Sequence, residues 1–215
     1  SKSGIDLPGE LSGTVPDASW KMMKMKQKWF VGDSLNTVIG QGNFLATPLQ
    51  VARYTALIAS GKLTQPYVAL SVAGKTKQPI IQDVLTPREK SFLPYIRKGM
   101  YDVCNSNGGT GCRYGLGNLL VKVAGKTGTA QVSAIGQHEK ERIKEYEMEY
   151  FKRSHAWFTG YGPFEEPRYA ITVMLEHGGH GGEAAGPIAG AIFNKLVELK
   201  YITRPQPLQQ SLLTQ

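Results

Sequence analysis

The sequence predicts a mixed α/β (α+β) fold, in which an antiparallel sheet packs against helices. Three segments in the second half of the chain have the composition of strands, at residues 120–132, 155–161 and 169–176. Two segments before them and one after them carry helix signals. A chain of 215 residues with 41% hydrophobic and 20% charged side chains has the composition of a globular protein and is long enough for one substantial core.

A capping box marks the start of the first helix. Thr47 can cap the helix, Pro48 suits its first turn, and Gln50 can bond back to the backbone of the cap. The residues that follow are rich in alanine and nearly uncharged up to Gly61, which can adopt the left-handed conformation that ends helices. We therefore expect a buried helix that ends at Gly61.

A second capping box consists of Thr86, Pro87 and Glu89. It predicts a helix over residues 87–104, which the glycine pair at 108–109 would end.

The strand at 169–176 is the most apolar of the three, which is typical of a central strand that is buried on both faces. The short connection at 163–168 predicts that the second and third strands pair as an antiparallel hairpin. A closing helix is expected at about residues 184–199, and a polar tail at 204–215.

A charged insert separates the first two strands. Residues 139–153 contain five acidic and five basic side chains together with several aromatic ones. This mixture predicts a surface helix or a mobile loop over the rim of a site.

The net charge of +8 raises the question of an anionic partner. Basic residues are densest at 20–30, where Lys21, Lys24 and Lys28 would share one face of a helix. This face is either a patch for a membrane surface or anionic polymer, or a solvated face over a small apolar seam. The second interpretation is favoured, and we expect no nucleic-acid partner because no nucleic-acid-binding motif is present. No apolar run approaches the roughly 18 residues that span a bilayer.

Two other groups of residues have side chains that could support metal or redox chemistry. Cys104 and Cys112 flank a glycine-rich loop, and free thiols are favoured over a disulfide. His177 and His180 lie in a glycine-rich turn that is either a metal site or a rim loop; the rim loop is favoured because no third ligand lies nearby. His155 is expected to be structural. We expect no metal and no cofactor.

The constellation that carries chemistry is Lys126, Thr127, Gly128 and Thr129, on the first predicted strand. A Lys-Thr-Gly triplet alone is a weak signal, and an exposed lysine can simply protect a sheet edge. Its context is stronger, because an apolar strand leads into it and two strands and a helix follow.

Three further motifs accompany the triplet: Ile39-Gly40-Gln41-Gly42, Thr47-Pro48-Leu49-Gln50 and Ala184-Ala185-Gly186-Pro187. In this order, and over nearly the whole chain, they resemble the transpeptidase domain of class B penicillin-binding proteins. The chain is most similar to penicillin-binding protein 2 of the bacterial elongation machinery. The resemblance implies the serine β-lactamase and penicillin-binding-protein fold, with helices on both faces of the sheet. Residues 1–203 would then be the C-terminal part of that domain.

The resemblance also implies roles for the motif residues in a D,D-transpeptidase. Lys126 would support proton transfer, and the backbone N–H of Thr129 would bind the oxyanion. The hydroxyls of Thr127 and Thr129 would hold the terminal carboxylate of the peptide, and Gly128 would let the substrate backbone approach the strand.

Two of the three family motifs, Ser-x-x-Lys and Ser-x-Asn, have no credible match here. The triplet at residues 34–36 fits Ser-x-Asn literally, but it lies in the turn-rich stretch at residues 32–42 that in the family follows the true motif. We therefore expect the nucleophilic serine outside this chain, and the chain alone to be inactive. The strand at 169–176 would leave an unpaired apolar edge without the earlier segment.

The implied partners are peptidoglycan stem peptides, β-lactam antibiotics, the missing N-terminal part of the same protein, and elongation-complex proteins such as the scaffold MreC and the glycosyltransferase RodA. The implied location is the periplasmic face of the bacterial inner membrane, through an N-terminal anchor outside this chain. Two alternatives stay open: a β-lactamase of the same fold, and a non-catalytic module that binds partners in an elongation complex.

Overall fold

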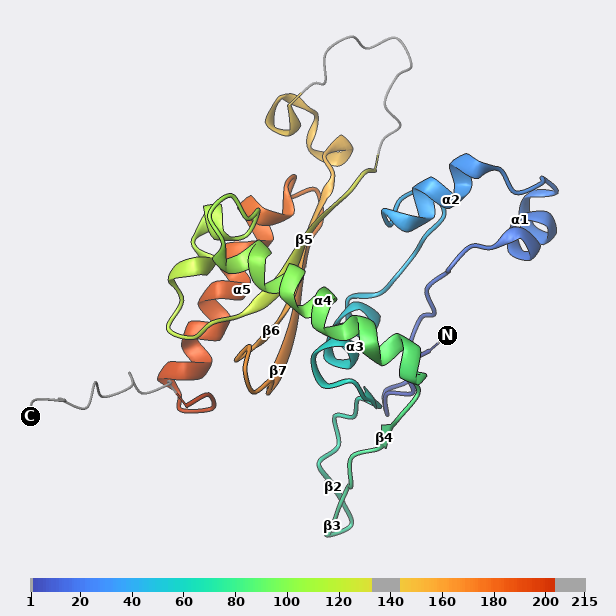
Figure 1. The fold of residues 1–215 in the computed structure, drawn as a ribbon. Helices are drawn as coiled ribbons and strands as arrows, with labels where there is room; N and C mark the ends of the chain where they lie inside the picture. Colours follow the sequence, from blue (N-terminus) through green and yellow to red (C-terminus); the bar gives the residue numbers. More distant parts are fainter. Residues whose placement is uncertain (1, 133–143, 204–215) are drawn as a thin grey trace, which may run out of the picture.

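A three-stranded antiparallel sheet forms the centre of the computed structural model, which describes residues 2–132 and 144–203. Its strands are β5 (Ala124–Ala130), β6 (His155–Gly162) and β7 (Tyr169–Leu175), in the order β5-β6-β7. Both pairs are antiparallel, so the predicted hairpin between the last two strands is confirmed. Figure 1 shows the strands side by side between helices.

Three helices cover this sheet: α3 (Pro48–Ser60), α4 (Pro87–Asn105) and α5 (Gly181–Glu198). The capping boxes predicted for the first two are present, with Thr47 bonded to Gln50 and Thr86 bonded to Glu89. The closing helix begins three residues earlier than predicted, at Gly181 instead of about residue 184. These local signals therefore place both capped helix starts correctly.

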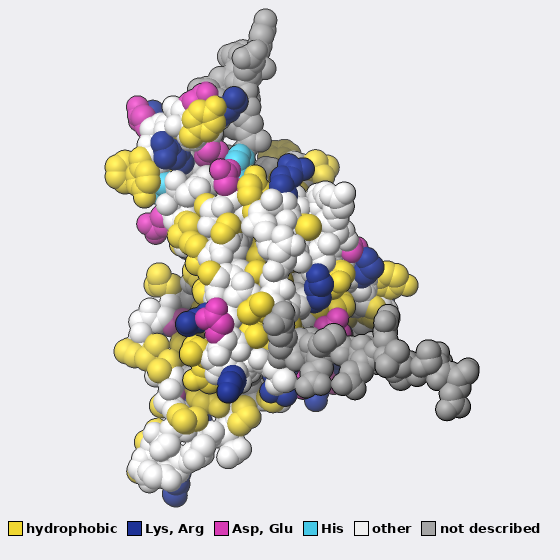
Figure 2. Space-filling model, turned by 90° about the vertical axis from the view of Figure 1, so that its left-hand side faces the viewer, with side chains coloured by type: hydrophobic (Ala, Val, Ile, Leu, Met, Phe, Trp, Pro, Cys, Tyr) yellow, Lys and Arg dark blue, Asp and Glu magenta, His cyan; other side chains and the backbone are white. Residues whose placement is uncertain are grey.

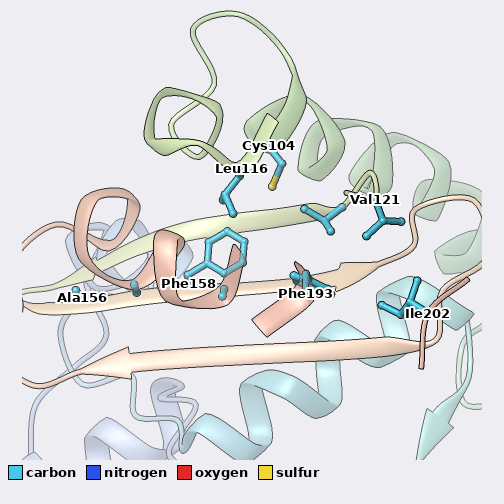
Figure 3. Close-up of a cluster of buried hydrophobic side chains, with 10 residues drawn as sticks. Cys104, Leu116, Val121, Ala156, Phe158, Phe193 and Ile202 are labelled. Atoms are coloured by element: carbon cyan, nitrogen blue, oxygen red, sulfur yellow. The ribbon is translucent and has the colours of Figure 1, made fainter. Parts of the chain in front are cut away.

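The sheet is covered on both faces, as the mixed α/β prediction requires. Alternate residues of β6 point to opposite sides. Ala156 and Phe158, both fully buried, belong to a core cluster with Phe193 of α5, which Figure 3 shows beside the strands. Tyr161 belongs to a second cluster, with Ala59 of α3 and residues of α4. The predicted fold class is confirmed.

The smaller elements surround this centre. α1 (Ala18–Met25) and α2 (Val31–Val38) lie away from the sheet in Figure 1. Two short antiparallel pairs follow α3 and extend from the opposite end. They are β1 (Leu63–Thr64) with β4 (Ile81–Gln82), and β2 (Ser71–Val72) with β3 (Lys75–Thr76). Short 3-10 turns η1 (Cys112–Tyr114) and η2 (Leu116–Asn118) connect α4 to β5.

The stretch predicted to be turn-rich instead contains the helix α2. Its first turn is held by Asp33, whose carboxylate accepts from the Phe30 N–H at 2.7 Å and from the Lys21 ammonium at 2.6 Å. These two bonds, the Lys21 bond first, lower the pKa of Asp33. The Lys21–Asp33 ion pair therefore stabilises α2, although the turn-forming residues of this stretch do not predict a helix.

The predicted lysine face at residues 20–30 is wrong for the same reason. Lys21 is buried and paired with Asp33, so it faces inward. The helix ends at Met25, and Lys26 adopts a left-handed conformation. Lys28 therefore lies beyond the helix and does not share a face with Lys24.

Within the described sheet β6 is central and β7 lies at an edge, as expected for this chain without the earlier segment, and the central position of β7 in a complete sheet stays a prediction. Every residue of β7 is half-buried, because α3 and α5 both pack against the strand. The apolar composition of β7 therefore indicates its burial between two helices and does not indicate its position in the strand order.

The described part of the charged insert consists of two 3-10 turns, η3 (Glu145–Glu147) and η4 (Tyr150–Lys152). The Glu145 carboxylate accepts from the backbone N–H of Ser154 at 2.8 Å and from its hydroxyl at 2.7 Å. Residues 139–143 of the insert, and the tail at 204–215, lie outside the described residues.

On the face that Figure 2 shows, basic and acidic side chains are intermixed among the described residues and form no continuous basic patch. Within the described ranges, none of the helices combines the length and apolar character needed to cross a bilayer.

A chain of buried hydroxyls joins α3 to the sheet. Thr55, fully buried, donates to the Val51 carbonyl at 2.8 Å, and its oxygen lies 2.7 Å from the hydroxyl of Thr159. Thr159 in turn lies 2.7 Å from the hydroxyl of Thr172 on β7. Three polar side chains are thus satisfied inside an apolar layer.

We expect Thr55→Val in the complete protein to lower the free energy of unfolding by about 1–3 kcal/mol, because Thr159 loses a buried partner. Thr55→Ser keeps the hydroxyl and is expected to cost less. Urea unfolding followed by fluorescence measures both changes. An unchanged unfolding free energy for Thr55→Val would show that the hydroxyl chain does not stabilise the fold.

Candidate active site

The four residues singled out from the sequence lie on β5, at the outer edge of the described sheet, because β6 pairs with the other edge. A cavity of about 420 Å³ opens along this edge. Its walls come from β5, from the start of α5, from the loop between α4 and β5, and from the residue that follows α2. The lining residues are Ile39, Thr110, Arg113, Tyr114, Lys126, Thr127, Gly128, Thr129, His180, Gly181 and Gly182.

The backbone of Thr129 faces away from the sheet. Its carbonyl accepts a hydrogen bond from the side-chain amide of Gln41 at 2.9 Å. Because the N–H and C=O of one strand residue point to the same side, the Thr129 N–H also faces outward. This is the orientation that an oxyanion donor requires.

The sequence marks Gln41 only as part of a Gly-Gln-Gly motif and does not predict its place in the site. It is 88 residues away from Thr129 in the sequence, so no local signal connects the two. Its motif context was the available hint.

Lys126 and the two threonines reach the edge from different faces of the strand. Side chains alternate along β5, so Thr127 and Thr129 share the face that carries α5 and Lys126 projects from the other. The exposed Lys126 ammonium bends around the edge and donates to the Thr127 carbonyl at 2.5 Å. The ammonium, the two hydroxyls and the outward N–H therefore meet where the two faces join.

Thr110 also belongs to this site, although the sequence did not single it out. Its hydroxyl lies 2.9 Å from the hydroxyl of Thr127. Thr110 sits in the loop that follows α4, where the N–H of Gly111 donates to the Val103 carbonyl at 2.9 Å. The loop is therefore fastened to the last turns of α4 and brings Thr110 to β5.

Two glycines allow α5 to approach this edge. A Cβ on Gly181 would lie 2.1 Å from the Trp157 carbonyl oxygen and 2.2 Å from that of Gly128. A Cβ on Gly182 would lie 2.6 Å from the Thr110 carbonyl oxygen. Both glycines are buried, and only a residue without a side chain fits at either position.

The glycine-rich turn expected to be a rim loop, residues 177–182, has two parts in the structure. Its second half is the first turn of α5, with His180 as the N-cap residue and a wall of the cavity. Its first half stays a turn in which His177 has a positive φ of 54°. The helix begins early because its first turn is packed against β5.

His155 and His177 bond to each other. The His177 backbone N–H donates to Nδ1 of His155 at 2.9 Å, and Nδ1 of His177 lies 3.1 Å from the Arg153 carbonyl oxygen. These bonds fasten the turn to the end of the insert, so His155 has the structural role expected of it. Among the described residues, no three His, Cys, Asp or Glu side chains are grouped as a metal site would require.

Both cysteines are free thiols. Cys104 lies in the apolar core, fully buried. Burial, with a smaller contribution from the nearby Cys112, raises the pKa of the Cys104 thiol to about 12. A thiol with such a pKa stays protonated at neutral pH and is a poor nucleophile.

Comparison with known proteins gives consistent matches over almost the whole chain. Residues 1–198 match the family model of the penicillin binding protein transpeptidase domain. The peptidoglycan D,D-transpeptidase MrdA of Haemophilus influenzae is 35% identical over 198 residues, covering 89% of this chain and 30% of the relative. The MrdA protein of Acinetobacter baumannii is 37% identical over 190 residues, covering 86% of this chain and 27% of the relative.

Solved structures give the same result. The penicillin-binding protein PBP2 from Helicobacter pylori, in complex with MreC, is 44% identical with a TM-score of 0.81, covering 94% of this chain and 34% of that one. Pseudomonas aeruginosa PBP2 in complex with WCK 5153 is 30% identical with a TM-score of 0.74, covering 89% of this chain and 40% of that one. The chain spans 30% and 27% of the length of these two curated relatives.

We expect Gly181→Ala in the complete protein to lower its thermal stability, because the added methyl group would overlap two backbone carbonyls. Gly99→Ala is the matched control: Gly99 lies within α4, and apart from its chain neighbours and the backbone of its own helix no atom lies within 4 Å of the added Cβ. In a helix that change stabilises by about 0.5–1 kcal/mol. Calorimetry of both variants tests this, and a Gly181→Ala protein as stable as Gly99→Ala would contradict the close contact.

Proposed function

Because the chain belongs to the penicillin-binding protein transpeptidase family, we propose that it is part of a peptidoglycan D,D-transpeptidase that cross-links stem peptides through a serine acyl-enzyme. The observation that carries the proposal is the outer edge of β5. There Lys126, the hydroxyls of Thr127 and Thr129, and an outward N–H line one cavity. A cation, hydroxyl donors and outward-facing backbone groups along a strand edge are what a peptide ending in a carboxylate needs.

The donor peptide would bind along β5 as an added strand, and its backbone N–H groups would displace Lys126 and Gln41 from the carbonyls of Thr127 and Thr129. Its terminal carboxylate would accept hydrogen bonds from the Thr127 and Thr129 hydroxyls. Gly128 supports this geometry because it carries no side chain between them that could obstruct the peptide backbone.

Acylation would follow by attack of a serine oxygen on the carbonyl carbon of the penultimate D-alanine. The new C–O bond places negative charge on the carbonyl oxygen, and the Thr129 N–H is oriented to stabilise that charge. The C–N bond then breaks, and terminal D-alanine leaves as an amine that takes up the proton lost by the serine. The Lys126 ammonium would support this proton transfer electrostatically.

Deacylation would use an amine of a neighbouring stem peptide. Its nitrogen attacks the ester carbonyl, a C–N bond forms, and the serine oxygen leaves and regains its proton. A β-lactam would acylate the same serine by opening of its ring, and its carboxylate would take the place of the peptide terminus at Thr127 and Thr129.

The nucleophilic serine belongs, in this proposal, to a segment of the protein outside these 215 residues, because the sequence offers no credible Ser-x-x-Lys motif. The whole protein would act at the periplasmic face of the inner membrane, where peptidoglycan is cross-linked. The PBP2 of Helicobacter pylori is known in complex with MreC, which supports elongation-complex partners, with RodA as a further candidate.

The test is covalent labelling of the complete protein by penicillin, followed by intact-mass spectrometry. We expect Lys126→Ala to slow acylation by about 10²- to 10⁴-fold, the usual contribution of a group that assists proton transfer. Lys75→Ala is the control, because Lys75 is an exposed strand lysine on β3, outside the cavity.

An unmodified complete protein that gains no mass from penicillin would overturn the proposed function. Acylation of Lys126→Ala at the rate of the unmodified protein would exclude the role given to this lysine. Rapid release of the bound penicillin, with repeated turnover, would favour a β-lactamase instead.

A further inference from the structure

The charges that line the β5 cavity have one sign. Arg113 and Lys126 are cationic, and the described lining contains no Asp or Glu. The Lys126 ammonium already donates to the Thr127 carbonyl, whereas the guanidinium of Arg113 has no hydrogen bond or ion pair within the part of the chain that the structure describes. An arginine that faces a cavity without a partner is available to a ligand.

The backbone of Arg113 is held in place. It lies in η1, where its N–H donates to the Gly109 carbonyl at 3.1 Å and the next turn closes from Gly115 to Cys112 at 3.0 Å. Leu116, which is 1% exposed, anchors the loop in the core. The backbone of Arg113 therefore has a fixed position beside the cavity.

The same loop contacts the predicted carboxylate site through hydroxyls. In the Thr110–Thr127 pair, each hydroxyl has one hydrogen, and only one of the two is used between them. The other hydrogen stays available to an acceptor in the cavity. One hydroxyl hydrogen and the guanidinium fork of Arg113 can together satisfy both oxygens of a carboxylate.

We propose that Arg113 determines specificity for ligands that end in a free carboxylate, acting from the α4–β5 loop that also places Thr110 beside the Thr127 hydroxyl. The inference rests on the proposed function, because it assigns the terminal carboxylate of the donor peptide to this wall of the cavity. Arg113 binds the carboxylate and takes no part in proton transfer.

The test uses the complete protein and two thioester donors that are identical except for a terminal carboxylate or carboxamide. Arg113→Ala is expected to lower the second-order rate constant of acylation by the carboxylate donor about 10- to 100-fold, the effect of losing a hydrogen bond to a charged group. The rate for the carboxamide donor is expected to change less than about twofold. Arg113→Lys keeps the positive charge but loses the paired donors of the guanidinium. Its rate constant with the carboxylate donor should lie between those of the unmodified protein and Arg113→Ala.

Arg88→Ala is the matched control, because it removes an exposed arginine from the first turn of α4, outside the cavity. It should leave both rates unchanged. If Arg113→Ala lowers the acylation rate equally with both donors, or with neither, while the unmodified protein is still acylated, the role of Arg113 is overturned. An unmodified protein that neither donor nor penicillin acylates would overturn the proposed function, and this inference with it.

Discussion

The contact between the start of α5 and the backbone of β5 is the constraint on which the site depends. Gly181 and Gly182 let the helix approach so closely that any side chain would overlap a carbonyl of a strand or of the α4–β5 loop. This contact sets three walls of the cavity at once, because the helix, the strand and the loop meet there. The apolar core beneath it, with Phe158 and Phe193, then holds the helix on the sheet.

The chemistry of the site follows from its position at a strand edge. Within a strand, neighbouring side chains point to opposite faces, and Lys126 could not approach Thr127 and Thr129 in the middle of a sheet. At the edge, an ammonium from one face and hydroxyls from the other meet beside the outward-facing backbone groups of β5. Antiparallel pairing with β6 makes β5 rigid, and the outward groups keep fixed directions.

The sequence predicted what is decided locally. The capping boxes at Thr47 and Thr86 located two helices, and strand composition located the whole central sheet. It failed for α2, because the Lys21–Asp33 ion pair that supports this helix is a tertiary contact. It recognised the motif on β5 but missed Gln41 and Thr110, since only the fold brings them to that strand.

The two side chains that occupy carbonyls of β5 have a consequence for solubility. An exposed edge strand is a template for association with the sheets of other molecules. Here the Thr127 carbonyl is occupied by Lys126 and the Thr129 carbonyl by Gln41. A second molecule that extended the sheet would have to displace both and bring its backbone against a charged ammonium. The edge is thus protected against self-association by the same side chains that border the cavity.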